Sequence, residues 1–128
     1  MPFEKDLRKL LDDYLTAYEA GDASACAEFY TGDGEIHSPF GPPVRGRAAI
    51  AETHASWFTL PEENKRLEVL QSGCRGDLGY ALLRYSANTS DGPEAGTSLN
   101  VFELDETGCW RFRVTSLNAD FATTEPVR

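Results

Sequence analysis

Positive charge is scarce in this sequence of 128 residues. Twelve Lys and Arg residues stand against 21 Asp and Glu residues, which gives a formal net charge of −9 at pH 7. Such a balance repels phosphate backbones and anionic lipid surfaces. No run of basic residues offsets it. The composition therefore argues against nucleic acid or a membrane surface as a partner.

Histidine, cysteine and long apolar runs are scarce as well. The two histidines fall in different predicted elements and the three cysteines lack CxxC spacing, so we expect no metal site and no disulfide framework. No Gly-rich phosphate loop follows a strand, so no organic cofactor is expected. The first residues lack the apolar segment of a signal peptide, and no apolar run is long enough to cross a bilayer. These absences predict a cytoplasmic protein.

Helical periodicity marks the first part of the chain. Apolar residues recur at intervals of three and four from Leu7 to Tyr18, which predicts an amphipathic helix that stops at Gly21. Asp22 is expected to cap a second, shorter helix that reaches Tyr30.

The middle of the chain is rich in residues that break regular structure. The cluster TGDG at 31–34 should interrupt the chain, 35–38 is typical of a short strand, and SPFGPPVRG at 38–46 should be a rigid loop. A third helix follows, with His54 and Trp57 on its apolar face. Pro61 should end it, and Glu62 with Glu63 should form a solvated turn.

The second half changes to the periodicity of strands. Four β-type runs are expected at 66–74, 79–88, 95–104 and 109–119, joined by turns that contain Gly and Asp. In the last run Trp110, Phe112 and Val114 alternate with polar residues, which predicts one buried face. Helices followed by a four-strand meander predict an α+β fold in a single domain, 1–128.

The order of these motifs resembles the nuclear transport factor 2-like superfamily, in particular its SnoaL-like and ketosteroid isomerase-like branches. The sharpest matches are YEAGD at 18–22 and HSPFGPPVRGRAAI at 37–50. The resemblance covers nearly the whole chain. It implies a cone-shaped α+β barrel of the cystatin-like type, in which three N-terminal helices pack on a curved antiparallel sheet around a pocket for a small apolar molecule. It also implies a homodimer through the outer face of the sheet.

The isomerase branch implies three catalytic positions, whose roles are those known for that family. Tyr14 matches the tyrosine that donates to the developing oxyanion. Asn100 stands where the family has a protonated aspartic acid, and Ser38 stands where it has the aspartate base. A serine hydroxyl cannot accept a proton near neutral pH without a neighbouring base. The usual proton shuttle is therefore missing at position 38.

Further residues of the implied pocket are aromatic. Tyr30 and His54 match the places of two tyrosines that assist the oxyanion donor, so a hydrogen-bonded group of Tyr14, Tyr30 and His54 is expected. Each residue also has a structural alternative: Tyr14 as a core aromatic, His54 as a satisfied core histidine, Asn100 on the outer face of its strand. The expected ligand-binding residues are Tyr18, Tyr30, Phe40, Trp57, Phe58, Phe102, Trp110 and Phe112.

Two functions remain open from the sequence. The first is an enzyme that isomerises, cyclises or dehydrates a hydrophobic carbonyl compound, with Tyr14 and Asn100 polarising it and His54 or a water moving the proton. The second is a non-catalytic module that holds a small ligand or serves for dimerisation, and the missing aspartate at Ser38 supports it. Outside this set we expect His37 and Asp120 at the surface and Arg84 in an outward ion pair.

Overall fold

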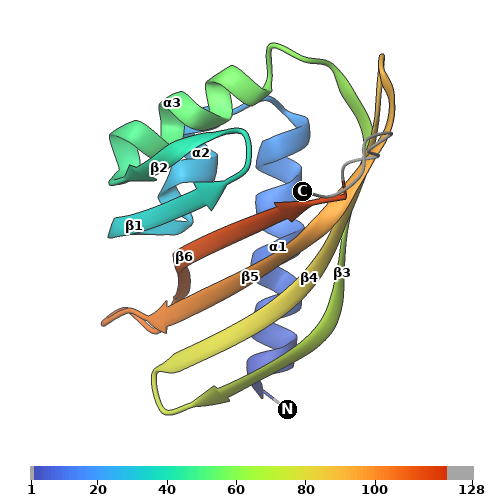
Figure 1. The fold of residues 1–128 in the computed structure, drawn as a ribbon. Coiled ribbons are helices and arrows are strands. Elements are labelled where there is room, and N and C mark those ends of the chain that lie inside the picture. The colour runs from blue at the N-terminus through green and yellow to red at the C-terminus, as the bar shows by residue number, and fades with distance from the viewer. Residues whose placement is uncertain (1, 121–128) are drawn as a thin grey trace, which may run out of the picture.

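The computed structural model describes residues 2–120, so Met1 and residues 121–128 of the predicted domain lie outside the described part. Figure 1 shows α1 crossing the concave side of a bent sheet, with α3 and a short hairpin across one end. Helices followed by a curved sheet make the α+β fold that the sequence predicts. The elements are α1 (Pro2–Glu19), α2 (Ala23–Glu28), β1 (Tyr30–Ser38), β2 (Gly41–Arg45), α3 (Arg47–Trp57), β3 (Glu62–Arg75), β4 (Leu78–Thr89), β5 (Gly92–Leu104) and β6 (Trp110–Ala119).

One apolar face holds α1 against the sheet. Gly21 ends this helix as predicted: its φ of 68° is left-handed, and its amide bonds the carbonyl of Tyr18 at 3.0 Å. The Asp22 carboxylate then accepts from the amide of Ala25 at 3.0 Å and caps α2. This second helix ends at Glu28, earlier than predicted. The buried face of α1 consists of Phe3, Leu7, Leu10, Leu11, Tyr14 and Tyr18.

The sheet has six strands in the order β2-β1-β6-β5-β4-β3. The last four form the predicted meander, but β1 joins it by running parallel to β6, with Ile36 opposite Thr115. The sheet is therefore not wholly antiparallel. Strands β2 and β3 stay at its two edges, so it is bent without closing into the predicted barrel.

Two segments expected to be irregular are strands. The cluster 31–34 lies within β1, and residues 41–45 of the proline-rich loop form β2. Within the described part of the chain, β2 pairs only with β1, with Ile36 opposite Val44. A proline lacks the amide proton that an inner strand needs, but an edge strand tolerates it. The edge position thus explains why Pro42 and Pro43 are compatible with a strand.

A register shift in β6 changes which residues face the interior. Phe112 is opposite Phe102. The neighbouring Val101 is opposite Val114, so one residue of β6, Arg113, has no partner of its own in β5. This bulge turns Thr115 inward, where it is 7% exposed. The predicted burial of Val114 through simple alternation is therefore wrong, and a hydroxyl enters the core.

Aromatic rings fill the narrow end of the core. Phe3 contacts Trp110 with ring centroids 4.9 Å apart, and Phe102 contacts Phe112 at 5.0 Å. A Cβ at Gly79 would lie 2.7 Å from the Phe3 ring. The absence of a side chain at Gly79 leaves room for the Phe3 ring against β4.

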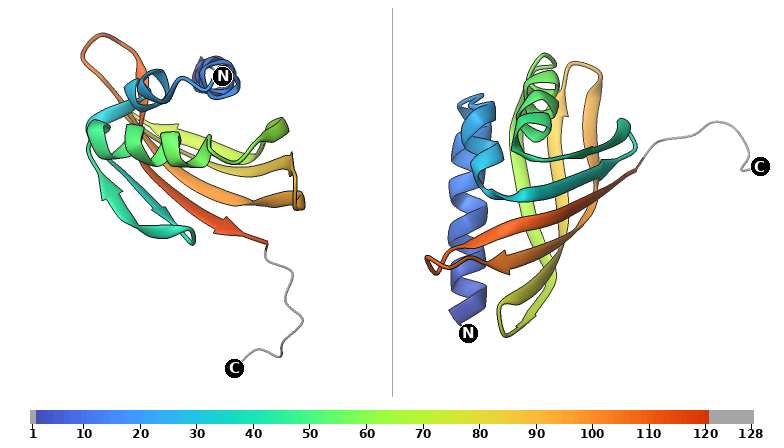
Figure 2. Two further views of the ribbon diagram at one scale, coloured as in Figure 1. Left: turned by 90° about the horizontal axis from the view of Figure 1, so that it is seen from above. Right: turned by 90° about the vertical axis from the view of Figure 1, so that its left-hand side faces the viewer.

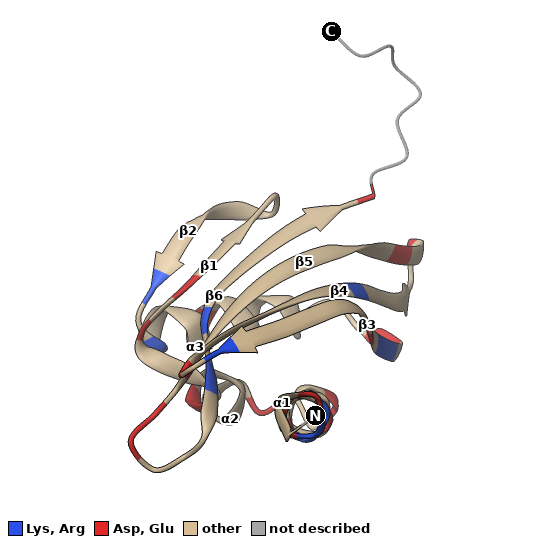
Figure 3. Ribbon diagram, turned by 90° about the horizontal axis from the view of Figure 1, so that it is seen from below, with Lys and Arg blue, Asp and Glu red and all other residues tan. Residues whose placement is uncertain are grey.

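Within residues 2–120, no helix covers the outer face of the sheet. Figure 2 shows α1, α2 and α3 on one side of it. Strand β4 carries a single charged residue, Arg84, and Figure 3 shows long uncoloured stretches along β4 and β5. Four large apolar side chains of this face are at least 39% exposed. We call them the outer patch: Leu70, Leu78, Tyr80 and Leu99.

Candidate functional site

Tyr14 of α1 and His54 of α3 meet in the interior. The Tyr14 hydroxyl oxygen lies 2.7 Å from Nε2 of His54, which is fully buried. Nδ1 of the same ring lies 2.9 Å from the carbonyl oxygen of Ile50, one turn earlier in α3. A carbonyl oxygen can only accept, so Nδ1 carries the proton and Nε2 accepts. The Tyr14 hydroxyl is therefore the donor to His54.

Burial keeps both members of this pair neutral. It lowers the pKa of His54 to about 4, so the ring is uncharged at pH 7. Burial, with Tyr30 nearby, raises the pKa of Tyr14 well above its usual value. A donor already bound to His54 can reach a ligand only by leaving Nε2 unpaired, which costs about 1–3 kcal/mol in a buried site. The pair as it stands is a satisfied one.

Tyr30 belongs to a separate network. Its hydroxyl lies 2.9 Å from Oγ1 of Thr115, which donates to Oδ1 of Asn100 at 2.8 Å. Nδ2 of Asn100 in turn donates to Oγ of Ser98 at 3.0 Å. Thr115 gives its single proton to Asn100, so the Tyr30 hydroxyl must donate to Thr115. The four side chains form one directed chain that links β1, β6 and β5.

The expected group of Tyr14, Tyr30 and His54 is therefore wrong as a hydrogen-bonded unit. The ring centroids of Tyr30 and His54 are 6.3 Å apart, and the two rings meet edge to face. The sequence could not show this, because the partner of Tyr30 is the bulged Thr115.

Asn100 faces inward and is 1% exposed, which excludes its outward alternative. Its amide nitrogen is directed to Ser98, with the carbonyl at 3.3 Å and the hydroxyl at 3.0 Å. Every side-chain nitrogen or oxygen in residues 2–120 that is completely shielded from solvent has a hydrogen-bond partner. Tyr14 and Asn100 thus hold donors that are engaged within the protein, where an oxyanion hole requires donors aimed at the ligand.

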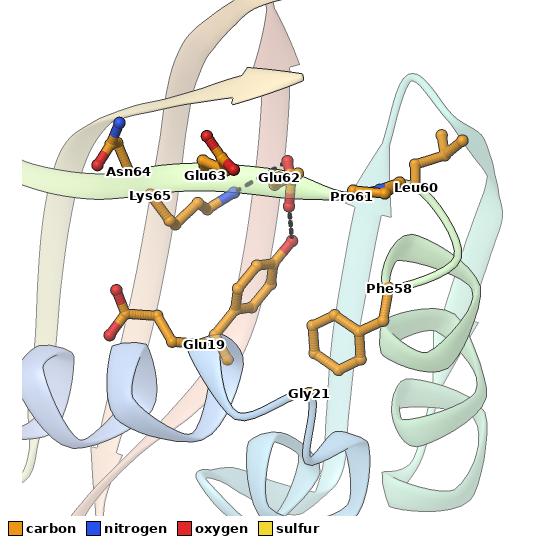
Figure 4. A pocket seen from close by; sticks show the side chains of 10 residues that line it. Glu19, Gly21, Phe58, Leu60, Pro61, Glu62, Glu63, Asn64 and Lys65 are labelled. Carbon is orange, nitrogen blue, oxygen red and sulfur yellow. Dashed lines mark hydrogen bonds and ion pairs between the residues drawn. The ribbon is translucent and has the colours of Figure 1, made fainter. Parts of the chain in front are cut away.

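An open cleft of about 530 Å³ lies where the ends of α1 and α3 meet the start of β3. We call it the α1–α3 cleft. Figure 4 shows Phe58 at the end of α3 facing Glu62 and Lys65 across it. Of the predicted ligand-binding residues, Tyr18 and Phe58 line it. The remainder of its wall is Glu19, Gly21 and residues 60–65.

Three polar side chains converge in this cleft. The Tyr18 hydroxyl donates to Oε1 of Glu62 at 2.5 Å, and Nζ of Lys65 lies 4.0 Å from Oε2 of the same carboxylate. The side chains of Glu62 and Lys65 are only 13% and 14% exposed. The ammonium also lies over two rings, at 4.7 Å from the centroid of Tyr18 and 5.2 Å from that of Tyr85.

Electrostatics couples these groups because little water reaches them. Burial lowers the pKa of Lys65, while the carboxylates of Glu62 and Glu94 oppose that shift. Burial and the hydrogen bond to Glu62 raise the pKa of Tyr18. The predicted solvated turn at Glu62 is therefore wrong: the residue begins β3 and its carboxylate is part of a buried cluster.

A smaller cleft of about 150 Å³ separates α3 from the β1–β2 hairpin. Ser38, Phe40 and Trp57 line it, and the Phe40 amide donates to Oγ of Ser38 at 3.2 Å. Its other lining residues bring no carboxylate or imidazole: they are Ile36, Gly41, Pro42, Val44, Thr53 and Ser56. Ser38 thus shares its cleft with no group of the lining that could act as a general base.

The remaining predicted residues lie outside both clefts. Phe102, Trp110 and Phe112 lie in the aromatic core and line neither cleft. His37 lies at the surface, 3.1 Å from the carboxylate of Glu35. The outward ion pair expected of Arg84 is present, and its partner is Asp120 at 2.5 Å.

Sequence reasoning missed Lys65, Glu62 and Thr115. Strand parity carried a signal for the first: Lys65, Leu67 and Val69 all face inward on β3. Because the strand was expected to start at residue 66, Lys65 was left out of this alternation. Thr115 had no comparable signal, because a bulge leaves no mark in the alternation of residue types.

No group of three or more His, Cys, Asp or Glu side chains within residues 2–120 could hold a metal ion. In the same part of the chain, no helix combines the length and apolar character needed to cross a membrane.

Comparison with known proteins identifies the family. The family model of the SnoaL-like domain matches residues 11–116. No functionally curated protein matches the sequence. Similar solved structures include a protein of unknown function from Mycobacterium tuberculosis, 19% identical, covering 94% of this chain and 73% of its own, with a TM-score of 0.81.

Two further structures are similar over most of both chains. A ketosteroid isomerase-like protein from Erwinia carotovora atroseptica is 20% identical, covers 90% of this chain and 94% of its own, and gives a TM-score of 0.78. An NTF2-like protein with a cystatin-like fold from Novosphingobium aromaticivorans is 21% identical, covers 94% and 84%, and gives 0.76. At these identities the likeness shows the fold. With the family match, it follows that the chain belongs to the SnoaL-like domain family and has the NTF2-like, cystatin-like fold.

Proposed function

We propose that this protein binds a small, partly apolar molecule in the α1–α3 cleft. The observation that carries the proposal is a cleft of about 530 Å³ on whose wall Tyr18, Glu62 and Lys65 converge. Ligand sites are typically concave spaces of roughly 300–1,000 Å³ with a few convergent polar groups among apolar ones. Phe58, Leu60 and Pro61 supply the apolar wall here.

The hydrogen bonds favour a binding role over isomerase-type catalysis. Tyr14 donates to His54, and the amide of Asn100 is directed to Ser98. Ser38 replaces the carboxylate base, and no lining residue of its cleft can substitute for it. Proton abstraction beside a carbonyl needs both a base and a free oxyanion donor. Neither is supplied at the positions that the isomerase resemblance names.

A second candidate is an enzyme acting on a hydrophobic carbonyl compound. The Tyr14–His54 pair favours it, because a neutral imidazole that accepts from a tyrosine forms a donor–acceptor relay. Catalysis would require Tyr14 to turn from Nε2 of His54 to the substrate oxygen. Isomerisation, cyclisation and dehydration are the reactions that such polarisation serves.

The test compares the two clefts in binding. A library of small neutral and charged compounds is screened by native mass spectrometry, and each hit is titrated against Phe58→Ala and Phe40→Ala. Phe58→Ala removes a wall of the α1–α3 cleft, whereas Phe40→Ala removes one from the smaller cleft and serves as the matched control. Weakened binding only in Phe58→Ala supports the proposal. Hits that weaken only in Phe40→Ala would contradict it.

The catalytic candidate has its own assay. Ser38→Asp restores a carboxylate at the position of the family's base, and steroid double-bond migration is then measured. Activity gained in this variant and lost again on adding Tyr14→Phe supports oxyanion stabilisation by Tyr14. Absence of activity in a folded Ser38→Asp protein argues against it.

Two further expectations stay proposals. A homodimer through the outer face of the sheet is supported by the outer patch of Leu70, Leu78, Tyr80 and Leu99. A cytoplasmic location is supported by three free cysteines, two of which are exposed.

A further inference from the structure

Lys65 is unusual in its position. It is a cleft-lining lysine with a side chain only 14% exposed, whereas Lys9 of α1 is 77% exposed and pairs with Asp13. Within residues 2–120 its ammonium donates no direct hydrogen bond to a protein atom, and the carboxylate oxygen of Glu62 is 4.0 Å away. An amine placed in this way is held in position by packing and remains able to meet a ligand.

The charges around the cleft restrict what that ligand can be. Glu19, Glu62 and Glu63 all line it, so a carboxylate or phosphate would be repelled. A cationic ligand would compete with Lys65 itself, which already occupies the space between the Tyr18 and Tyr85 rings. A neutral molecule avoids both conflicts. Among neutral groups, a carbonyl is the one that an amine can both hydrogen-bond and attack.

We infer that Lys65 is a nucleophilic lysine that forms an imine with a neutral aldehyde or ketone bound in the α1–α3 cleft. The inference rests on the proposed binding function and assigns its ligand class. Glu62 is placed to move the protons: Oε1 is fixed by the Tyr18 hydroxyl, and Oε2 faces the amine of Lys65.

The step is balanced without any further reactant. The neutral amine attacks the carbonyl carbon, the C–N bond forms, and the π pair of the carbonyl moves to oxygen. Glu62 carries one proton from nitrogen to that oxygen, which gives the carbinolamine, and then a second proton, so that the C–O bond breaks and the oxygen leaves as water while the C=N bond forms. The products are one imine and one water.

Only the uncharged amine is a nucleophile, so its proton balance matters. Burial lowers the pKa of Lys65 and thereby increases the fraction of free amine. The groups facing it act in the opposite direction, because carboxylates and π faces stabilise an ammonium. Those groups are Glu62, Glu94, Tyr18 and Tyr85.

The chain contains an internal control, since its only lysines are Lys5, Lys9 and Lys65. The full-length protein is incubated with benzaldehyde and sodium cyanoborohydride at pH 7, which converts any imine to a stable benzylamine. Labelling at each lysine is followed by peptide mapping. We expect Lys65 to react about tenfold faster or more than Lys5 and Lys9, because the cleft holds the aldehyde beside an amine whose pKa is lowered by burial. It should also reach its maximal rate at a lower pH than a lysine in a short unstructured peptide, because burial lowers its pKa.

A second measurement separates this inference from the proposed function. Benzaldehyde binding without reductant is followed by ligand-observed NMR in the wild type and in Phe58→Ala. Saturable binding that Phe58→Ala weakens, together with rapid labelling of Lys65, supports both. Saturable binding with labelling of Lys65 no faster than that of Lys9 overturns the inference and leaves the binding function standing. Rapid labelling without saturable binding overturns the binding function instead.

Glu62→Gln tests the proton transfer. This variant keeps the size of the side chain and an acceptor for Tyr18 but removes the carboxylate. Slower labelling of Lys65 with unchanged labelling of Lys9 is expected. Equal or faster labelling of Lys65 in a folded variant would remove Glu62 from the mechanism.

Discussion

The Tyr14 hydroxyl donates to Nε2 of His54 at 2.7 Å, while Nδ1 of the same ring donates to the carbonyl of Ile50 at 2.9 Å. Both ring nitrogens are thereby engaged, and the ring is fully buried. The pair ties α1 to α3 at the level where α1 passes the inner face of the sheet. Without a ligand that replaces one of the partners, this hydrogen-bonded pair serves to connect two helices.

Tyr14→Phe tests whether the hydrogen bond between Tyr14 and His54 is structural. The variant leaves Nε2 of His54 buried without a donor, so we expect the free energy of unfolding to fall by about 1–3 kcal/mol. Urea denaturation measures this change. Ligand binding in the α1–α3 cleft should be unchanged, because Tyr14 does not line it. If stability is unaffected while turnover of a substrate is lost, the pair is catalytic rather than structural.

The pH dependence of stability should report the burial of His54. Its folded pKa of about 4 lies below its unfolded value of 6.5, so the unfolded chain binds more protons between these two values. Stability is fully present above pH 6.5 and is lost as the pH falls towards 4. The loss from this one group is about 3 kcal/mol. The His37→Gln variant leaves His54 as the single imidazole, whose titration can be followed by NMR.

A control variant isolates the contribution of His54 from that of the carboxylates. In the His37→Gln background, His54→Gln removes the remaining imidazole, so the stability of the double variant should change less between pH 6.5 and 4 than that of the His37→Gln protein. An identical slope in both would show that His54 does not titrate as burial implies.

The sequence predicted the architecture because periodicity and turn chemistry are local. The left-handed Gly21 and the cap at Asp22 appear as expected. The predictions that failed depend on contacts between distant parts of the chain. Strand β1 pairs with β6, far along the chain, and residues 41–45 form a strand because they pair with β1 at the edge of the sheet. Local residue types such as Gly and Pro could not indicate these pairings.

The candidate site was less accessible from sequence for the same reason. Helical spacing placed Tyr14 and His54 on inward faces, and their pairing followed from the family resemblance. The partners of Asn100 depended on a bulge in β6, and Lys65 depended on where β3 starts. A shift of one residue in either strand would reverse the direction of its side chains.

Asn100→Leu tests the network that links β5 and β6. The substitution removes the acceptor of Thr115 and the donor to Ser98. We expect a loss of about 1–3 kcal/mol, since buried hydroxyls lose their partners. Thr115→Val should cost less in the Asn100→Leu background than in the wild type, because the acceptor of the Thr115 hydroxyl is already gone and only the Tyr30 hydroxyl then loses its partner. A double-mutant cycle in urea measures the coupling, and strictly additive losses would mean that the network is not cooperative.

Gly96→Ala tests the close approach beneath Tyr85. A Cβ at Gly96 would lie 2.2 Å from the backbone oxygen of Asn118 and 2.5 Å from the Tyr85 hydroxyl. Backbone must shift to admit it, so we expect destabilisation of about 1–3 kcal/mol. Gly32→Ala is the control, because no atom lies within 4 Å of its added Cβ. Equal melting temperatures for the two variants would show that the strands can shift to admit the methyl group without loss of stability.

Leu99→Lys tests the proposed homodimer. Leu99 is 49% exposed at the outer patch and lies directly opposite Leu82 on β4. An interface that buries it must desolvate any charge placed there, and an unpaired buried charge is strongly unfavourable. Sedimentation velocity should find a dimer for the wild type and a 14.1 kDa monomer for the variant. Leu60→Lys changes an even more exposed leucine away from the sheet and should leave the dimer intact. A monomeric wild type would show that this interface does not exist. Dissociation of both variants would show that the dimer interface is not confined to the outer face of the sheet.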